Sequence, residues 1–299
     1  MQNKNQNWGG IWTEQKLVAF EKYVNAYLTI MLNQRIKHNG WPQTIIYFDG
    51  FAGCGDRSSH KNQDKHDTLL FSELDIDESE INVYKGSAER VVSLDKKFDE
   101  YYFIDIDKKA LENLKNKIEQ YFDKKSKYEF LPKDINEVLS SFSNYLDNSK
   151  VALILLDPFG MQLNWASIEK LKNKKVDIWI LLPSGIIINR LLDRKGNLKN
   201  INKLESFFGI TKDEIQKEFY KSKKENTLFG EIEITQKIND SIEKIAELYT
   251  KRLKTIWNYV TEQPLVLYNN RNVPIYHFVF ASNNGTAKKI ASQIINIKK

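Results

Sequence analysis

The sequence predicts an α/β fold built on a Rossmann-like sheet of seven strands, mostly parallel with one antiparallel, and a helical insertion. Apolar strand patterns alternate with helical periodicity over residues 44–186, which favours parallel crossovers with helices on both faces. A glycine-rich turn directly follows the first strand, and a strand pair closes the chain after a charged segment of helical period. These three observations together predict the fold class.

Composition limits the classes of protein that the chain can belong to. Of its 299 residues, 41% are hydrophobic and 12% aromatic, which supplies a sizeable core and argues against disorder. A single cysteine, Cys54, excludes an intramolecular disulfide and a cysteine-rich zinc site, and it suits a reducing compartment. With no long apolar run and no secretory signal at the start, we expect a cytoplasmic protein without a membrane anchor. The net charge of +6 is compatible either with a polyanionic partner or with solvated lysines.

The first predicted element is a long amphipathic helix from Thr13 to about Gln34, with Thr13 as its cap. Gly40 to Pro42 then breaks the helix, and the β-branched and aromatic run Thr44 to Phe48 reads as a buried strand. Residues 56–85 form a long polar stretch, which we expect to be an extended loop.

After this loop, strands and helices alternate. Ser87 is a candidate cap for a helix through about Lys97, and further helices are expected at 108–122, 135–146 and 167–173. Four more strands are predicted, a buried one at residues 101–107 and others at 127–132, 151–160 and 176–183.

The last third of the chain divides into two parts. Residues 187–262 are charged and helical in period, with Thr211 as a predicted helix cap, and they are expected to form a helical insertion. Strands at 264–268 and 275–282 and a closing helix complete the sheet. The predicted organisation is therefore an N-terminal helical segment (1–43), a core (44–186), the insertion (187–262), and a C-terminal strand pair with a helix (263–299).

The turn from Asp49 to Gly55 is the strongest single motif. Its glycines, Gly50, Gly53 and Gly55, allow a tight turn and close approach of a ligand to the main chain. An aspartate at the start of the turn repels phosphate and suits the cationic sulfonium and amino group of S-adenosylmethionine (SAM). An ordinary tight turn remains the alternative. A nicotinamide dinucleotide is disfavoured because the turn lacks the G-x-G-x-x-G spacing that opens a helix.

Two further carboxylates follow predicted strands. Asp105 ends the second strand, where an α/β nucleotide site needs an acceptor for the ribose hydroxyls, while Asp107 could instead cap the next helix. Asp134 follows the third strand and could accept a hydrogen bond from an adenine amine or cap a helix. The full predicted cofactor set is Asp49, Gly50, Phe51, Ala52, Gly53, Gly55, Asp105, Ile106, Asp134, Ile135 and Asp157.

The tetrad Asp157, Pro158, Phe159 and Gly160 ends the fourth strand, and Asp157 to Phe159 are the predicted catalytic residues. Methyl transfer to an exocyclic amine needs an acceptor for the amine N–H groups and an aromatic face to hold the base. Asp157, the carbonyl of Pro158 and the ring of Phe159 supply these groups. A strand end with a proline turn would account for Pro158 and Gly160 but not for the carboxylate.

Other polar candidates carry less weight. His60 and His66 lie near Asp64 and Asp67 in the polar loop, but two histidines in such a loop are more often solvated than bound to metal, so no metal is predicted. Trp41 could stack on a base or simply pack.

The segments FDGFAGCG, GSAERVVSL, FIDID, LLDPFG, LLPSGIIINR and YHFVFAS resemble, in order and spacing, the three-Cys-motif partner (TcmP) family. This resemblance runs from Trp12 to about Gly285 and implies similarity to class I SAM-dependent methyltransferases, hence a methyltransferase-type Rossmann sheet. It also implies a partner protein with a three-cysteine motif. The DPFG tetrad further resembles that of tRNA guanine dimethyltransferases, with Phe159 replacing the second proline of the related Asp-Pro-Pro-Tyr motif.

The expected function is therefore SAM-dependent methylation of an exocyclic amine of a nucleic-acid base in the cytoplasm of a bacterium. The alternative is a catalytically inactive, methyltransferase-like partner or regulatory subunit of a two-gene defence or modification module. The family's partner name and the long loop after Gly55 favour that alternative.

Overall fold

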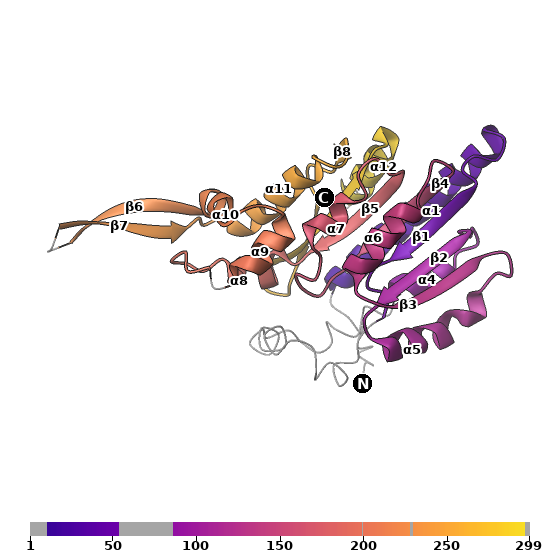
Figure 1. The fold of residues 1–299 in the computed structure, drawn as a ribbon, viewed down its shortest axis with the longest axis horizontal. Coiled ribbons are helices and arrows are strands. Elements are labelled where there is room, and N and C mark those ends of the chain that lie inside the picture. The colour runs from indigo at the N-terminus through magenta and orange to yellow at the C-terminus, as the bar shows by residue number, and fades with distance from the viewer. Residues whose placement is uncertain (1–10, 54–85, 199, 228–229, 297–299) are drawn as a thin grey trace, which may run out of the picture.

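The fold is described by a computed structural model that covers residues 11–53, 86–198, 200–227 and 230–296. Its centre is a mixed sheet of eight strands in the order β3-β2-β1-β4-β5-β10-β8, with β9 also paired to β10 (Figure 1). The strands are β1 (Thr44–Asp49), β2 (Glu100–Asp105), β3 (Lys127–Pro132), β4 (Lys150–Leu156), β5 (Val176–Leu182), β8 (Tyr259–Val260), β9 (Leu265–Tyr268) and β10 (Pro274–Ser282).

Helices connect and cover these strands on both faces. They are α1 (Ile11–Lys37), α4 (Ser87–Val92), α5 (Lys108–Ile118), η2 (Glu119–Tyr121), α6 (Ile135–Tyr145), α7 (Trp165–Glu169), η3 (Ser184–Ile188), α8 (Asn189–Leu191), α9 (Ile201–Phe208), α10 (Lys212–Phe219), α11 (Ser241–Leu253) and α12 (Gly285–Asn296). Contacts link α1 with α4 and α12 on one side, and α6 with α7 on the other.

The predicted fold class is confirmed. Strands β1 to β5 pair in parallel, and β10 runs antiparallel to β5 and β9. All seven predicted strands are present, and the one antiparallel strand lies in the predicted closing pair. The two-residue strand β8 adds to the edge of β10 and was not predicted, because two residues are too short to produce an alternation pattern.

Strand β1 shows how the sheet is covered. Because successive side chains of a strand point to opposite faces, Tyr47 and Phe48 contact different layers. The Tyr47 ring lies 6.3 Å from that of Phe20 in α1, whereas the Phe48 ring lies 4.5 Å from that of Phe142 in α6. The sheet is therefore the middle layer of three.

Two predicted helix caps are wrong. The chain is already helical at Ile11, so Thr13 lies inside α1 rather than capping it. Gly86 is the N-cap of α4, Ser87 is the first helical residue, and the helix ends at Val92 rather than near Lys97. The hydroxyl of Ser87 is instead directed to a carboxylate in the sheet. The predicted cap Thr211 is confirmed, since it forms a capping box with Glu214 at the start of α10.

Residues 187–262 are not purely helical, which corrects the prediction for this segment. Between α10 and α11, β6 (Tyr220–Thr227) and β7 (Gly230–Lys237) form a separate antiparallel hairpin. Figure 1 shows this hairpin extending away from the rest of the molecule. The sequence of β6, YKSKKENT, has a single apolar side chain, Tyr220, and so lacks the apolar alternation by which strands are recognised.

No helix in the described ranges combines the length and the apolar character that crossing a membrane requires.

Candidate active site

The parallel strands bring the predicted carboxylates to one edge of the sheet. Asp49 is the last residue of β1, Asp105 the last of β2, and Asp157 directly follows β4. Since β1 pairs with both β2 and β4, these three aspartates end three adjacent parallel strands. Ligands of open α/β sheets bind at this edge, beyond the carboxyl ends of the strands.

Asp49 is fully buried and is held by neutral donors. The Tyr47 hydroxyl (3.0 Å) and the Ser87 hydroxyl (3.3 Å) donate to its Oδ2, and the backbone N–H of Phe51 (3.3 Å) donates to Oδ1. Burial raises the pKa of Asp49 to about 7, and charge repulsion from Asp157 acts in the same direction. A carboxylate in this state gains from a nearby cation.

The glycine turn packs closely against the strand ends. A Cβ on Gly53 would lie 3.1 Å from Cβ and Cγ of Asp105, and a Cβ on Gly50 would lie 2.6 Å from the Leu156 side chain. The backbone N–H of Ala52 donates to the carbonyl of Ile104 at 2.9 Å. A side chain at Gly50 would force its neighbours to shift, a Cβ at Gly53 would be in tight contact, and the turn lies directly beside Asp105.

Asp105 and Asp107 accept different backbone N–H groups, and only Asp107 caps a helix. Oδ1 of Asp105 accepts the backbone N–H of Asp107 at 2.8 Å. Asp107 is the N-cap of α5 and accepts the N–H groups of Lys109 and Ala110, as its cap alternative predicted. Ile106 between them is 54% exposed although apolar, which leaves a flat aliphatic surface beside the Asp105 carboxylate.

Asp134 is the N-cap of α6, with the backbone N–H of Asn136 donating to its Oδ1 at 2.8 Å. This is the cap alternative of the prediction. Ile135 is buried, and its side chain lies against the position of a Cβ on Gly50. It therefore packs against the turn and does not face solvent.

Asp157 differs from Asp49 in its partner. The Lys16 ammonium of α1 forms a buried ion pair with Asp157 Oδ2, and both side chains are nearly inaccessible to solvent. Within the part of the chain that the structure describes, the buried Oδ1 has no hydrogen-bond partner. Burial raises the pKa of Asp157, and the Lys16 charge opposes that rise.

The rest of the tetrad shapes the turn after β4. Pro158 is buried, Phe159 is partly buried against the core, and the N–H of Gly160 donates to the Gln162 side chain at 2.8 Å. Asp157 and Phe159 thus both follow the carboxyl end of β4, as predicted, and Phe159 is only partly buried.

Sequence reasoning missed three groups that contact the predicted aspartates. Tyr47 was assigned only to a strand and Ser87 to a cap, and Lys16 was not singled out within the predicted first helix. A signal for Lys16 exists, because it lies four residues before Phe20 and thus on the apolar stripe of α1. Nothing in local sequence pairs Lys16 with a residue 141 positions later.

A buried serine and histidine lie at the end of the neighbouring strand β5. The Ser184 hydroxyl and the His277 Nδ1 are 2.6 Å apart, and His277 of β10 pairs with Leu182 of β5. Burial lowers the pKa of His277 to about 4, so the imidazole is neutral at pH 7.

Part of the predicted site lies outside the described residues. Cys54, Gly55, the loop 56–85, and the histidines His60 and His66 belong to that part.

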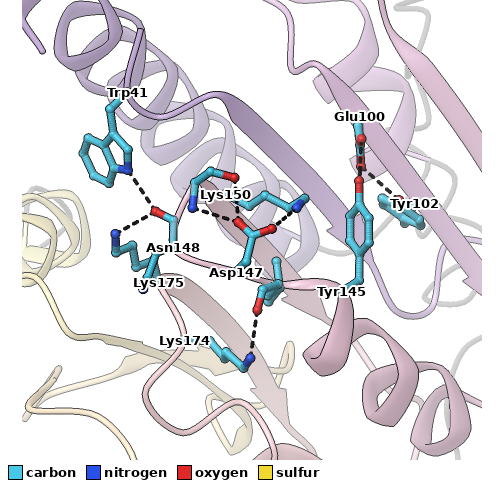
Figure 2. Close-up of polar contacts among 11 residues, drawn as sticks. Trp41, Glu100, Tyr102, Tyr145, Asp147, Asn148, Lys150, Lys174 and Lys175 are labelled. Carbon is cyan, nitrogen blue, oxygen red and sulfur yellow. Dashed lines mark hydrogen bonds and ion pairs between the residues drawn. The ribbon is translucent and has the colours of Figure 1, made fainter. Parts of the chain in front are cut away.

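The opposite edge of the sheet holds a polar cluster of another kind (Figure 2). There Trp41 and Lys175 both donate to the carbonyl of Asn148, at 3.0 and 2.8 Å, and the Lys175 ammonium lies 4.7 Å from the Trp41 ring centroid. Lys150 pairs with Asp147, which lowers the pKa of that carboxyl. The contacts join the connection between α6 and β4 to its neighbours, so this cluster stabilises the fold.

The chain matches no model of a known protein family, and no curated protein matches its sequence. Among solved structures, it is similar to protein LPL1258 from Legionella pneumophila, of family DUF519, with 12% identity, a TM-score of 0.39, and coverage of 93% of this chain and 98% of that one. It is also similar to Trm1 from Pyrococcus horikoshii, solved with S-adenosyl-L-methionine, with 11% identity, a TM-score of 0.42, and 92% of this chain covered. The chain spans 57% of the length of that Trm1 chain.

Proposed function

We propose that this protein binds SAM at the ends of β1 and β2 and transfers its methyl group to an exocyclic amine of a nucleic-acid base. The observation that carries the proposal is Asp157, a buried carboxylate after β4 that has one oxygen paired with Lys16 and the other without a partner in the described chain. An amine N–H is the complementary donor. The methyltransferase-like sheet supports the proposal because it supplies both sites on one edge.

The residues around Asp49 fit the cofactor. Asp49 has neutral donors and a raised pKa, so a cationic sulfonium or ammonium group would stabilise its charged form. Asp105 would accept from the ribose hydroxyls, and the exposed aliphatic face of Ile106 would cover one side of the adenine. Gly53 keeps the main chain close enough for this arrangement.

Bound SAM would supply an electrophilic methyl group: the amine lone pair would form the new N–C bond, and the electron pair of the methyl–sulfur bond would go to sulfur. Asp157 Oδ1 accepts an amine N–H and thereby directs the nitrogen lone pair. The nitrogen becomes cationic as it is methylated, and the Asp157 carboxylate then takes the excess proton. Phe159 would hold the base by stacking, and the net charge of +6 favours a polyanionic acceptor.

A cofactor titration tests the first half of the proposal. Asp105→Ala is expected to weaken SAM binding by about 10- to 100-fold, since it removes charge-assisted hydrogen bonds to the ribose. Asp107→Asn is the matched control, because asparagine also caps α5 and only the neighbouring charge is lost. Equal SAM affinity of Asp105→Ala and wild type in calorimetry would contradict the proposed site.

Transfer of a labelled methyl group from SAM to DNA, RNA and protein fractions tests the second half. Label in nucleic acid that is lost in Asp157→Asn, with SAM binding retained, is the expected result. Tight SAM binding with no transfer to any acceptor, with or without a three-Cys-motif partner protein, would favour the regulatory-subunit alternative.

A further inference from the structure

Three aspartates are buried on the face of the sheet that α1 covers: Asp49, Asp157 and Asp177. Asp49 has donors on both oxygens, and Asp177 accepts from Tyr23 on Oδ2 at 2.6 Å and from Ser282 on Oδ1. All these donors are neutral. Two of the three buried carboxylates are therefore fully satisfied by uncharged groups, as structural polar groups usually are.

Asp157 departs from this arrangement in both respects. Its Oδ2 is paired with a lysine ammonium, and its Oδ1 has no partner in the described part of the chain. Lys16 is only 2% exposed, and burying an ammonium there costs more than a hydroxyl donor would. Of these three aspartates, the described structure thus places a charged donor at the one whose second oxygen is open.

We propose that Lys16 is the positioning residue for Asp157 in the methyl transfer described above, on which this inference rests. Its ammonium fixes Oδ2, which leaves Oδ1 as the acceptor for the amine N–H. Its charge also keeps the buried carboxylate ionised, so that Oδ1 accepts and does not donate. A protonated Asp157 would present a hydroxyl to the amine and could not take its proton.

The electrostatic surroundings require such a cation. Lys16 from α1 acts on the Asp157 carboxyl by charge and by a hydrogen bond, and Asp157 in turn raises the pKa of Asp49 and of Tyr47 on β1. Asp49 repels a negative charge on Asp157, and burial disfavours that charge as well. Lys16 opposes both effects through an ion pair and a hydrogen bond. Without Lys16, Asp157 would take up a proton at a higher pH.

The direct test follows Asp157 ionisation by NMR of carboxyl-labelled aspartates across pH, with Asp157→Asn identifying the resonance. In Lys16→Met the titration midpoint of Asp157 is expected to rise by about 1 to 3 pH units, whereas Lys16→Arg should keep it near the wild-type value. Because a protonated Asp157 no longer repels the charge on Asp49, Lys16→Met should also lower the titration midpoint of Asp49. If Lys16→Met does not fold, Lys16→Gln removes the charge while keeping an N–H donor for Oδ2. An unchanged Asp157 midpoint in the neutral variant would overturn the inference.

The second readout is the pH profile of methyl transfer. Lys16→Met or Lys16→Gln should lower kcat at pH 7 by at least about 10-fold, with the acid limb displaced to higher pH and SAM affinity retained. Lys16→Arg, which keeps the positive charge, should retain most of the wild-type kcat. A neutral variant with the wild-type profile would refute the role of Lys16. If wild type itself transfers no methyl group, the proposed function fails, while the NMR midpoints still decide whether Lys16 sets the ionisation of Asp157.

Discussion

Lys16 and Asp157 also affect the free energy of unfolding, because each is a buried charge that the other compensates. Lys16→Met leaves the Asp157 carboxylate buried without its cation and is expected to lower the free energy of unfolding by about 3 to 5 kcal/mol at pH 7. The double variant Lys16→Met with Asp157→Asn removes both charges and should recover most of that loss. Urea unfolding of the two variants measures the difference. A double variant as unstable as Lys16→Met would show that packing, not charge, links the two residues.

The ionisation of Asp49 couples cofactor binding to pH. Its pKa is raised to about 7, so below that pH a cationic ligand must displace a proton from the carboxyl group. We therefore expect the affinity for SAM to increase as the pH rises from about 5.5 to about 7.5, with proton release in calorimetry. Asp49→Asn should bind SAM more weakly and without this rise. A parallel rise in that variant would place the responsible group elsewhere.

At the scale of elements, strands of the sheet were the most predictable part. β3, which is only partly buried, was predicted at its observed bounds. β1, β4, β5 and β10 were predicted to within a few residues, because these buried strands are apolar runs bounded by polar turns. The positions of Asp49, Asp105 and Asp157 at strand ends followed from the same pattern.

What local sequence could not supply was pairing between distant elements. The contact of Lys16 with Asp157 depends on how α1 lies across β4, and that of Ser87 with Asp49 depends on how α4 packs after the undescribed segment 54–85. The hairpin β6–β7 was missed for a different reason, since its strands are rich in charged residues and pair only with each other.

That hairpin is expected to contribute little to stability. Replacing residues 222–235 with a two-residue Asn-Gly turn retains Tyr220, which is buried, and Lys237, whose ammonium donates to the carbonyl of Asn189 at 2.8 Å. The free energy of unfolding should change by less than about 1 kcal/mol, because a two-stranded hairpin is marginal by itself. Thermal unfolding of the shortened chain checks this. A large loss of stability would show that the hairpin packs on the body.

At the scale of the whole molecule, the buried titratable groups set how stability depends on pH. Burial raises the pKa of Asp49 to about 7 and of Asp177 to about 6, so the folded chain keeps protons that the unfolded chain loses above about pH 4. Their contribution to stability is full at low pH and is lost as the pH rises through these values. His277, with its pKa lowered to about 4, acts in the opposite direction between about pH 4 and 6.5.

Because two carboxyl groups lower the free energy of unfolding as the pH rises and one imidazole raises it, these three groups together predict a net fall in stability between about pH 4 and pH 7. Replacing Asp49 and Asp177 together with asparagine should make the slope of unfolding free energy against pH more positive, by up to about 2.7 kcal/mol per pH unit between pH 4 and 6. Urea unfolding at several pH values gives this slope. An unchanged slope would mean that the two aspartates are ionised in the folded protein.

The first and last helices in the described ranges lie together on one face of the sheet, since α1 contacts α12 and the ring of Trp12 stacks on that of Tyr276 in β10 at 5.0 Å. During synthesis on the ribosome, the apolar stripe of α1 is therefore fully covered only after β10 has been made. Tyr23 packs against Phe280 and bonds to Asp177, so docking of α1 closes loops of 154 residues and more. The Lys16–Asp157 pair joins residues 141 positions apart, so a nascent chain released before β4 has been made would lack this pair and the site around it.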